Sequence, residues 1–353
     1  MGRATRLIHA AGVGVVLTLN AVEGIVTMSE QSKQEKRREK KRKERSMDST
    51  PTNPTTPFVW NPILRQYLVN APHRMNRREG VATCPFCADI TEGRVGPDAQ
   101  AWVRSNDFPP LLPPVGEAYV VIYSRAHDRT FWEMSIDEVA TVTRLWRDLY
   151  RDLATRYPAV MIFENSGTAI GQTQFHPHGQ TFGVAAIPPT LEREMETVRL
   201  DEAEGRGCPF CRVRKKLEDG PQQVDANETW QAFLPPYARY PYETHLYPRR
   251  HAANLALLGD DELRDLAALL LRVIQGYNRL YDGAIAPMPY LLGLHQLADE
   301  RFHLHVEIQA IGRAPGKLKY AAASESIWGQ WTNDSAPATK AHELRDAIAT
   351  LPG

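Results

Sequence analysis

The chain of 353 residues contains four cysteines, and all four belong to two copies of one short motif, Cys-Pro-Phe-Cys. The copies begin at Cys84 and Cys208, and a histidine follows each of these cysteines by 43 positions, at His127 and His251. An internal repeat of this kind constrains the fold, because each copy usually builds one similar structural unit. The sequence therefore predicts two halves that follow the same chain path.

The order of the other elements supports the repeat. In each copy a β-rich run precedes the histidine, and a helical pattern of apolar residues follows it. A further apolar strand comes next, and a His-x-His pair closes each copy, as His176-Pro-His178 and His303-Leu-His305. Ser135 and Glu138 have the spacing of a capping box at the start of the first helical pattern, which favours a helix there.

These patterns predict an α+β fold of two tandem half-units, each with an antiparallel sheet and one long helix. The half-units should be related by a pseudo-twofold axis, in an arrangement that allows their sheets to join. We expect a disordered or weakly structured leader with a basic tail and a Pro-rich linker at 1–57, an N-terminal catalytic half at 58–200, a second half at 201–334, and a C-terminal tail at 335–353.

The leader gives no sign of a membrane protein. Its apolar stretch at 7–26 is interrupted by Asn20 and Glu23, is too short in its uninterrupted part to span a bilayer, and is not followed by an A-x-A cleavage pattern. The block at 33–45 holds nine Lys or Arg and three Glu without an apolar residue, which is typical of a solvated tail. Since the formal net charge is zero, we expect neither a membrane nor nucleic acid as a partner.

The paired spacing of the cysteines favours metal binding over disulfides. This spacing lets a tight turn point both thiolates at one ion, whereas disulfide frameworks rarely consist of two C-x-x-C pairs alone. A thioredoxin-type redox motif is the competing interpretation, but it would need one such pair opening a helix, not two copies that are each followed by distant histidines. Thiols reserved for metal fit the cytoplasm best, and this is the localisation that we expect.

Each half supplies two thiolates and two imidazoles, enough for a closed tetrahedral shell of a structural ion. Donors rich in thiolate favour Zn²⁺ over harder ions, so we expect one or two zinc ions per chain. A single histidine is more often a hydrogen-bonded core residue, but the recurrence of the whole set favours ligation. The predicted ligands are Cys84, Cys87, His127 and His176 in the first half, and Cys208, Cys211, His251 and His303 in the second.

The first His-x-His pair also predicts a nucleophile. Residues two apart on a strand face the same side, so His176 can bind metal while His178 faces the adjacent cleft. A neutral imidazole is a competent nucleophile toward phosphorus. Gln180 can donate its amide N–H groups to phosphate oxygens without offering a proton for hydrolysis. Glu307 holds the corresponding place in the second copy, where its charge would repel a phosphodiester, so we expect the first half to be catalytic.

A polar, glycine-containing segment leads into this pair. Gly167 and Gly171 allow close backbone approach, and Asn165, Gln172 and Thr173 supply donors to phosphate and sugar. Taken alone, such a segment is found as often in a plain loop as in a phosphate-binding site. Beside the histidine pair it predicts a phosphate-binding segment, although not a Walker loop, because no Gly-Lys-Ser/Thr follows.

With these motifs the sequence resembles galactose-1-phosphate uridylyltransferase, a branch of the histidine-triad superfamily. The resemblance runs from about Asn61 to Asp334 and rests on His176-Pro-His-Gly-Gln180, on Phe163-Glu-Asn165 and on a preceding C-x-x-C. It implies histidine-triad-like half-units and a ping-pong reaction. UDP-glucose would uridylylate His178 and release glucose 1-phosphate, and galactose 1-phosphate would then take the uridylyl group to give UDP-galactose.

The resemblance also implies roles for further residues. The first Cys-Cys-His-His set resembles the family's zinc ligands, and Gln180 resembles the residue that steadies the uridylyl intermediate. A homodimer with shared active sites is implied as well. For Arg74, Arg77 and Lys319, which are assigned roles in the next sentence, the alternative interpretation is that they are ordinary charged residues of the surface. Asn106, Asp107 and Phe108 resemble the uracil and ribose contacts, Arg74 and Arg77 resemble arginines that reach the neighbouring subunit's nucleotide, and Lys319, Tyr320 and Glu325 resemble a C-terminal arm that contacts sugar and phosphate there.

Two points stay open. Some relatives bind a second ion through a glutamate and three histidines; Glu194, His295 and His305 match these positions, but Glu307 replaces the last histidine, so we favour the cysteine set with zinc where relatives can hold iron. The alternative functions are an adenylyl transferase or phosphorylase acting on ADP-sugars or dinucleotides, and a non-catalytic zinc scaffold or nucleic-acid binder that uses the basic block.

Overall fold

The computed structural model describes residues 58–76 and 84–352. The chain divides into two compact units, Met1–Thr56 and Pro57–Gly353, and all described residues belong to the second. The leader, its basic block and its linker, whose character we predicted from the sequence, lie outside the described residues, and so does Arg77. Among the described residues, no helix is both long enough and apolar enough to cross a bilayer.

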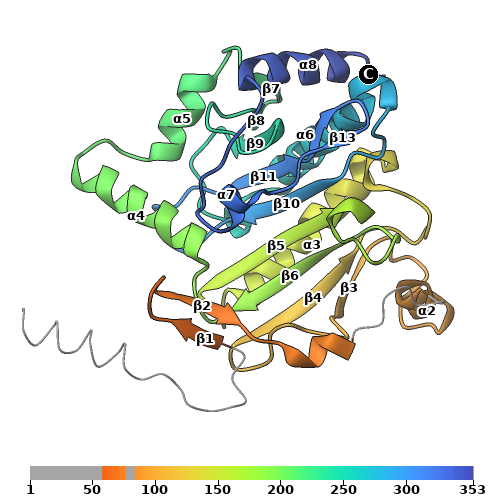
Figure 1. Ribbon diagram of the computed structural model, residues 1–353. Coiled ribbons are helices and arrows are strands. Elements are labelled where there is room, and N and C mark those ends of the chain that lie inside the picture. Colours follow the sequence, from red (N-terminus) through yellow and green to blue (C-terminus); the bar gives the residue numbers. More distant parts are fainter. Residues whose placement is uncertain (1–57, 77–83, 353) are drawn as a thin grey trace, which may run out of the picture. The chain divides into compact units, whose positions relative to one another are not determined.

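A nine-stranded antiparallel sheet forms the centre of the fold (Figure 1). The strand order across the sheet is β3-β4-β6-β5-β10-β11-β9-β8-β7. The first half supplies β3 (Trp102–Ser105), β4 (Gly116–Ile122), β5 (Ala159–Ser166) and β6 (His178–Val184), and the second supplies β7 (Gln223–Ala226), β8 (Trp230–Phe233), β9 (Tyr242–Pro248), β10 (Tyr290–His295) and β11 (His305–Ala310).

The sheet has the symmetry that the repeat predicted. Outward from the junction of β5 and β10, the order β5-β6-β4-β3 on one side matches β10-β11-β9-β8 on the other. The two junction strands are antiparallel, with Glu164 opposite Leu292, as a twofold axis through the junction requires. The predicted α+β fold of two joined antiparallel half-units is therefore confirmed, and β7 is an addition of the second half.

One long helix from each half covers the same face of the sheet. These are α3 (Ile136–Leu153) and α6 (Asp260–Arg279), which contribute fully buried side chains such as Trp146 and Leu270 to one common core. The Thr143 hydroxyl on α3 donates a hydrogen bond to the Leu263 carbonyl on α6 at 3.2 Å. The predicted capping box of α3 is present, since Ser135 Oγ accepts from the Glu138 N–H and Glu138 Oε2 accepts from the Ser135 N–H.

The shorter elements flank this two-layer core. Each Cys-Pro-Phe-Cys motif opens a short helix, with its first cysteine at the N-cap and the proline at the first helical position, which suits the fixed φ of proline. The remaining elements are β1 (Phe58–Asn61), β2 (Gln66–Val69), α2 (Pro85–Thr91), α4 (Pro189–Ala203), α5 (Pro209–Leu217), β12 (Gly312–Ala314), β13 (Lys317–Leu318), α7 (Ala323–Ser326) and α8 (Pro337–Ala349).

The segment expected as a C-terminal tail contributes to the core. Its helix α8 buries Ala341, Leu344 and Ile348 within the cluster that α6 and the sheet form. Gly276 on α6 makes this close approach possible, because a Cβ at that position would lie 2.5 Å from the Ile348 Cγ1 atom. The helix therefore belongs to the folded unit.

We predict that Gly276→Leu lowers the free energy of unfolding by about 1–3 kcal/mol, because the added side chain must push α8 away from α6. The change is expected although leucine is the better helix former. Urea titration followed by circular dichroism measures it. Gly293→Ala is the control, since nothing lies within 4 Å of the added Cβ there. Equal midpoints for Gly276→Leu and the unaltered chain would contradict the packing of α8.

Candidate active site and metal centres

The nucleophile predicted from the sequence lies at the start of a central strand. His178 and Gln180 are two residues apart on β6, between β4 and β5, and therefore face the same side of the sheet. Gly179 faces the opposite side, where a Cβ would lie 2.0 Å from the Tyr123 hydroxyl oxygen. The glycine between the two functional side chains is thus required by the close packing of Tyr123.

A hydrogen bond fixes the tautomer of His178. Its Nδ1 lies 2.8 Å from the backbone carbonyl oxygen of His176, and a carbonyl oxygen can only accept. Nδ1 must therefore carry the proton, and in a neutral imidazole the lone pair is then on Nε2. The ring has the tautomer that attack on phosphorus through Nε2 requires.

The first predicted metal set comes together beside this histidine. The ligand atoms of Cys84, Cys87, His127 and His176 all lie within 4.8 Å of one another. His176 Nδ1 is 3.7 Å and 3.6 Å from the two sulfur atoms, and His127 Nδ1 is 3.4 Å from Cys87 Sγ. A tetrahedral zinc ion separates a sulfur from a nitrogen ligand by about 3.6 Å, given the usual bond lengths. The donor set and its spacing fit zinc.

The other nitrogen of His176 supports the same interpretation. Nε2 lies 2.7 Å from the Ser124 carbonyl oxygen and must donate to it, which leaves Nδ1 as the ligand atom. His176 is fully buried, and burial lowers its pKa, so the imidazole is held neutral. A neutral ring oriented by a backbone carbonyl is the form in which histidine binds metal.

The second predicted metal set has nearly the same geometry. The ligand atoms of Cys208, Cys211, His251 and His303 also lie within 4.8 Å of one another. His303 Nδ1 is 3.7 Å and 3.4 Å from the two sulfur atoms, and His251 Nδ1 is 3.6 Å from Cys211 Sγ. These separations also fit a tetrahedral zinc ion. The structure therefore groups His303 with Cys208 and Cys211, in agreement with the ligand set that we favoured from the sequence.

A cavity of about 310 Å³ opens on the Gln180 side of His178. It brings together residues from four separate segments, among them five predicted for substrate binding or catalysis in addition to His178. Arg104 fixes the position of one of them by an ion pair of 2.6 Å with Asp107. The predicted residues that line this cavity are Asn106, Asp107, Phe108, Thr173, His178 and Gln180.

Other predicted residues stand apart from this cavity. Gln172 accepts a hydrogen bond of 2.6 Å from the Gly167 N–H, which closes the loop before the histidine pair, and its side chain lines a second cavity beside His178. Gly171 ends the short helix of this loop in a left-handed conformation with φ of 86°. Asn165 lies on β5, opposite Leu291 of β10. Neither Asn165 nor Gly171 is among the lining residues of the two cavities.

The predicted C-terminal arm lies in the second half of the chain. Lys319 is buried, forms an ion pair of 3.0 Å with Glu325, and donates to the Arg239 carbonyl oxygen at 2.7 Å. Tyr320 is exposed. Of the described residues, neither these three nor Arg74 lines either cavity beside His178. Within a single chain, the structure does not bring the arm to the nucleophile.

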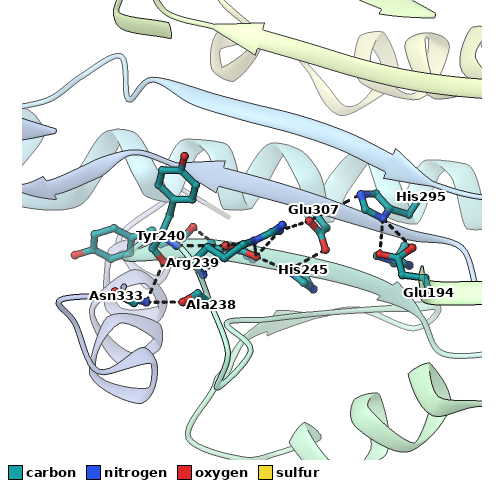
Figure 2. Close-up of polar contacts among 12 residues, drawn as sticks. Glu194, Ala238, Arg239, Tyr240, His245, His295, Glu307 and Asn333 are labelled. Carbon is teal, nitrogen blue, oxygen red and sulfur yellow. Dashed lines mark hydrogen bonds and ion pairs between the residues drawn. The ribbon is translucent and has the colours of Figure 1, made fainter. Parts of the chain in front are cut away.

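The second half repeats the backbone of the site with different chemistry. His305 begins β11 as His178 begins β6, and its Nδ1 likewise donates to the carbonyl oxygen two residues earlier, at 2.9 Å. Glu307, in the place of Gln180, forms ion pairs with Arg239 and with His245, the latter at 3.5 Å (Figure 2). Burial raises the pKa of Glu307, but the charges of His245, His295 and Arg239 outweigh it and hold this pKa low.

A rival metal group overlaps this network. The ligand atoms of Glu194, His295, His305 and Glu307 lie within 4.8 Å of one another, and His295 Nδ1 is 2.9 Å from Glu194 Oε1 (Figure 2). Arg239 already places a positive charge against Glu307 here. The four residues that the sequence left as an alternative are thus grouped together, apart from the cysteine set.

Sequence reasoning missed two kinds of functional candidate. Phe86 lines the 310 Å³ cavity, with its ring centroid 5.1 Å from that of His178 and the Arg104 guanidinium 5.9 Å above it. Its presence in both copies of Cys-Pro-Phe-Cys was a usable signal. Arg239 and Glu243, which pair at 2.8 Å, had no comparable signal, because only the folded sheet brings them to Glu307.

Comparisons with known proteins agree with this geometry. Two family models match, the N-terminal domain of galactose-1-phosphate uridyl transferase at residues 97–188 and the C-terminal domain at residues 210–345. A galactose-1-phosphate uridylyltransferase of Thermotoga maritima is 28% identical over 81% of this chain and 97% of its own length. One of Haemophilus influenzae is 30% identical over 67% of this chain and 77% of its own length.

Solved structures show the same relation. A structure described as a uridylyltransferase superposes with a TM-score of 0.75 at 26% identity and covers 83% of this chain and 98% of its own. An ADP-glucose phosphorylase from Arabidopsis thaliana shares the fold, with a TM-score of 0.66 at 19% identity, and covers 82% of this chain and 98% of its own. The chain belongs to the galactose-1-phosphate uridylyltransferase family, a family of nucleotidyltransferases.

Proposed function

We propose that the protein transfers UMP from UDP-glucose to galactose 1-phosphate through a uridylyl group on His178. The observation that carries this proposal is the hydrogen bond between His178 Nδ1 and the His176 carbonyl oxygen. It holds the proton on Nδ1 and therefore leaves Nε2 as the basic nitrogen. Relatives named for this activity cover most of the chain. An adenylyl or ADP-sugar reaction has only a shared fold in its favour.

The two half-reactions use the same imidazole. Nε2 attacks the α-phosphorus of UDP-glucose, a nitrogen–phosphorus bond forms, and the phosphorus–oxygen bond to glucose 1-phosphate breaks. A phosphate oxygen of galactose 1-phosphate then attacks the same phosphorus and the nitrogen–phosphorus bond breaks, which restores the neutral ring and yields UDP-galactose. Because the Nδ1–H group keeps its hydrogen bond to the His176 carbonyl oxygen throughout, the ring keeps its orientation in both steps.

Gln180 is suited to stabilise the intermediate. It lies on the same face of β6 as His178 and lines the same cavity. Its amide donates to non-bridging oxygens, where charge develops in the transition state, and carries no acidic proton. Asn106, Asp107 and Phe108 are assigned to uracil and ribose, and Asn165, Gly171, Gln172 and Thr173 to phosphate and sugar.

We also propose that each half holds a structural zinc ion in its Cys-Cys-His-His set. The first ion would be held by Cys84 and Cys87 at the start of α2, by His127 after β4 and by His176 just before β6. His176 would then be fixed by metal on one nitrogen and by Ser124 on the other. The backbone carbonyl that orients His178 belongs to this residue. The first half, 58–200, is thus the catalytic unit, and the second half, 201–334, its structural counterpart.

A homodimer with shared active sites accounts for the arm and for exposed apolar surface. Ile63 and Leu64, at the tip of the β1–β2 hairpin, are 86% and 64% exposed, and Ile327 and Trp328 beside the arm are 70% and 74% exposed. Such surface is typical of an interface with another protein. In the dimer Arg74, Arg77, Lys319, Tyr320 and Glu325 would serve the partner's site. Free thiols beside histidines favour a reducing compartment, so we propose a cytoplasmic protein.

Replacement of the nucleophile tests the mechanism. Incubation with UDP-glucose radiolabelled in its uridylyl group should leave label on the unaltered chain, and none on His178→Gly. Turnover of UDP-glucose with galactose 1-phosphate should fall on the order of 10⁴-fold or more. The matched control is His305→Gln at the corresponding position of the second half, which should still take up label. Label on His178→Gly would contradict the mechanism, and label from ADP-glucose alone would contradict the substrate.

The side chain of Gln180 can be tested by an isosteric change. Gln180→Glu places in the first half the carboxylate that Glu307 provides in the second. We expect uridylylation to slow about 10²- to 10³-fold, because one donor is lost and a negative charge faces the phosphate. Single-turnover measurement of label uptake checks this. An unchanged rate would show that Gln180 does not contact the transferred group.

Metal content and its pH dependence test the two zinc sites. We expect two zinc ions per chain by elemental analysis, and one each for Cys84→Ser and Cys208→Ser. Burial, followed by a hydrogen bond with Cys84, raises the pKa of Cys87 to about 11, so zinc must displace its proton at neutral pH. Zinc affinity, measured by chelator competition, should therefore rise with pH between 6 and 8. An affinity independent of pH would argue against ligation by Cys87.

A further inference from the structure

Arg104 is the only arginine or lysine among the described residues that line the 310 Å³ cavity beside His178. It lies on β3, opposite Val120 of β4, and Val120 lies opposite Gln180 of β6. Residues directly opposite each other on neighbouring strands point to the same face of a sheet, so Arg104 shares the face of Gln180. The arginine therefore points toward the region where we propose that the nucleotide binds.

The guanidinium group of Arg104 bonds in two directions. Its Nη1 donates to Asp89 Oδ2 at 3.1 Å and to the Pro85 carbonyl oxygen at 3.3 Å, and both of these residues belong to α2. Its Nη2 donates to Asp107 Oδ1 at 2.6 Å. Because the guanidinium group is planar and rigid, its anchorage on α2 fixes the direction in which Nη2 points. The carboxyl group of Asp107 is therefore held in one place, although its side chain is half exposed.

The buried carboxyl group of Asp89 does not by itself account for this arginine. Asp89 also accepts a hydrogen bond of 2.6 Å from Arg94 and one of 3.4 Å from the indole N–H of Trp102. Two further donors thus satisfy Asp89, one at each oxygen. The bond to Asp107 is what distinguishes Arg104 from these other partners.

The second half has no cation at the corresponding place. Glu307, which corresponds to Gln180, lies opposite His245 of β9, and His245 lies opposite Phe233 of β8. Phe233 therefore takes the place of Arg104, and it is fully buried. The sheet thus forms without an arginine at this position, in the half to which we assign no catalytic role.

The ion pair also sets the charge of the cavity. Among the described lining residues Asp107 is the only acidic one, and a nucleotide would bring its negative phosphate groups to the same cavity. Arg104 offsets a carboxylate that would otherwise repel them. Within the described part of the chain, Asp107 Oδ2 has no hydrogen-bond partner, and a carboxylate oxygen can accept from a hydroxyl group.

We propose that Arg104 is a positioning residue for nucleotide recognition. It holds Asp107 so that Oδ2 accepts from a hydroxyl group of the ribose, and the site thereby prefers ribonucleotides to deoxyribonucleotides. Arg104 acts through Asp107 and touches no reacting atom. The inference rests on the proposed function, which brings a uridine nucleotide to this cavity.

Titration calorimetry of the full chain with UMP, 2′-deoxy-UMP and 3′-deoxy-UMP tests the preference. UMP brings no leaving group to His178, so the measurement does not depend on transfer. We expect at least one deoxy compound to bind about tenfold weaker than UMP, because a hydrogen bond to a charged acceptor is lost. In Arg104→Met this ratio should fall to about twofold or less, and UMP itself should bind about tenfold weaker, because Asp107 loses both its position and its counter-charge.

The matched control is Arg94→Met. Arg94 pairs with the same Asp89, but its side chain is more than half exposed and it does not line the cavity. This variant should keep both the UMP affinity and the ratio. Label uptake from saturating UDP-glucose should fall less than about threefold in Arg104→Met, since the lost contact serves nucleotide binding and not the transition state.

A double variant tests whether Arg104 acts through Asp107. Arg104→Met combined with Asp107→Ala should show the same ratio as Asp107→Ala alone, because two residues that serve one contact are not additive. Additive losses would mean that Arg104 contacts the nucleotide directly, and would overturn the positioning role. Circular dichroism checks the fold of each variant. If Arg104→Met does not fold, Arg104→Lys takes its place with the same expected fall in ratio, because lysine offers one nitrogen instead of two.

Three binding results would also overturn the proposal. They are equal affinity of the unaltered chain for the three nucleotides, the absence of UMP binding at about 10 mM, and a folded Arg104 variant that keeps the ratio. Binding with the expected ratio but without label uptake would support the role of Arg104 and contradict the proposed transfer. The failure of one proposal is therefore distinguishable from the failure of the other.

Discussion

The hydrogen bond from His178 Nδ1 to the His176 carbonyl oxygen is the interaction on which the site depends. One residue, His176, offers its side chain to the first metal set and its backbone to the nucleophile. Any displacement of the metal shell would therefore move the carbonyl that fixes the tautomer of His178. This connection would give the proposed metal ion a structural use in the half that we propose to be catalytic, because the ion would hold the residue that orients His178.

The second half shows what the same backbone does with other side chains. His305 has the orientation of His178, yet burial lowers its pKa well below the usual value, and Glu307 faces it instead of an amide. Arg239 forms an ion pair with Glu307, and His245 lies 3.5 Å from it, so this carboxylate is engaged by neighbouring side chains of the protein. The second half thus keeps the strand order of the first half and differs from it in the side chains on one face of β11.

The repeat made much of the fold and of the metal sites predictable from the sequence. Spacing alone grouped the two Cys-Cys-His-His sets, because the sheet brings the end of one strand to the start of its neighbour in both halves. The remaining features depend on contacts between residues far apart in the chain. Lys319 pairs with Glu325 in a buried position that no local pattern indicates, and α8 packs on α6 only because Gly276 leaves room. Neither the proposed role of the arm nor the proposed dimer can be derived from local patterns.

The strand that carries His178 is constrained on both of its faces. On one face, His178 and Gln180 border the 310 Å³ cavity; on the other, the Tyr123 hydroxyl occupies the space where residue 179 would carry a Cβ. Tyr123 is itself fully buried, and burial raises its pKa well above the usual value, so its hydroxyl keeps its proton. The Glu164 carboxyl group lies beside Tyr123, and burial raises its pKa to about 7. A full negative charge on this carboxyl group would favour the protonated form of a nearby imidazole, which cannot attack phosphorus. Burial of Glu164 limits that charge, and the hydrogen bond to the His176 carbonyl oxygen holds the proton of His178 on Nδ1, so both favour a neutral ring with its lone pair on Nε2.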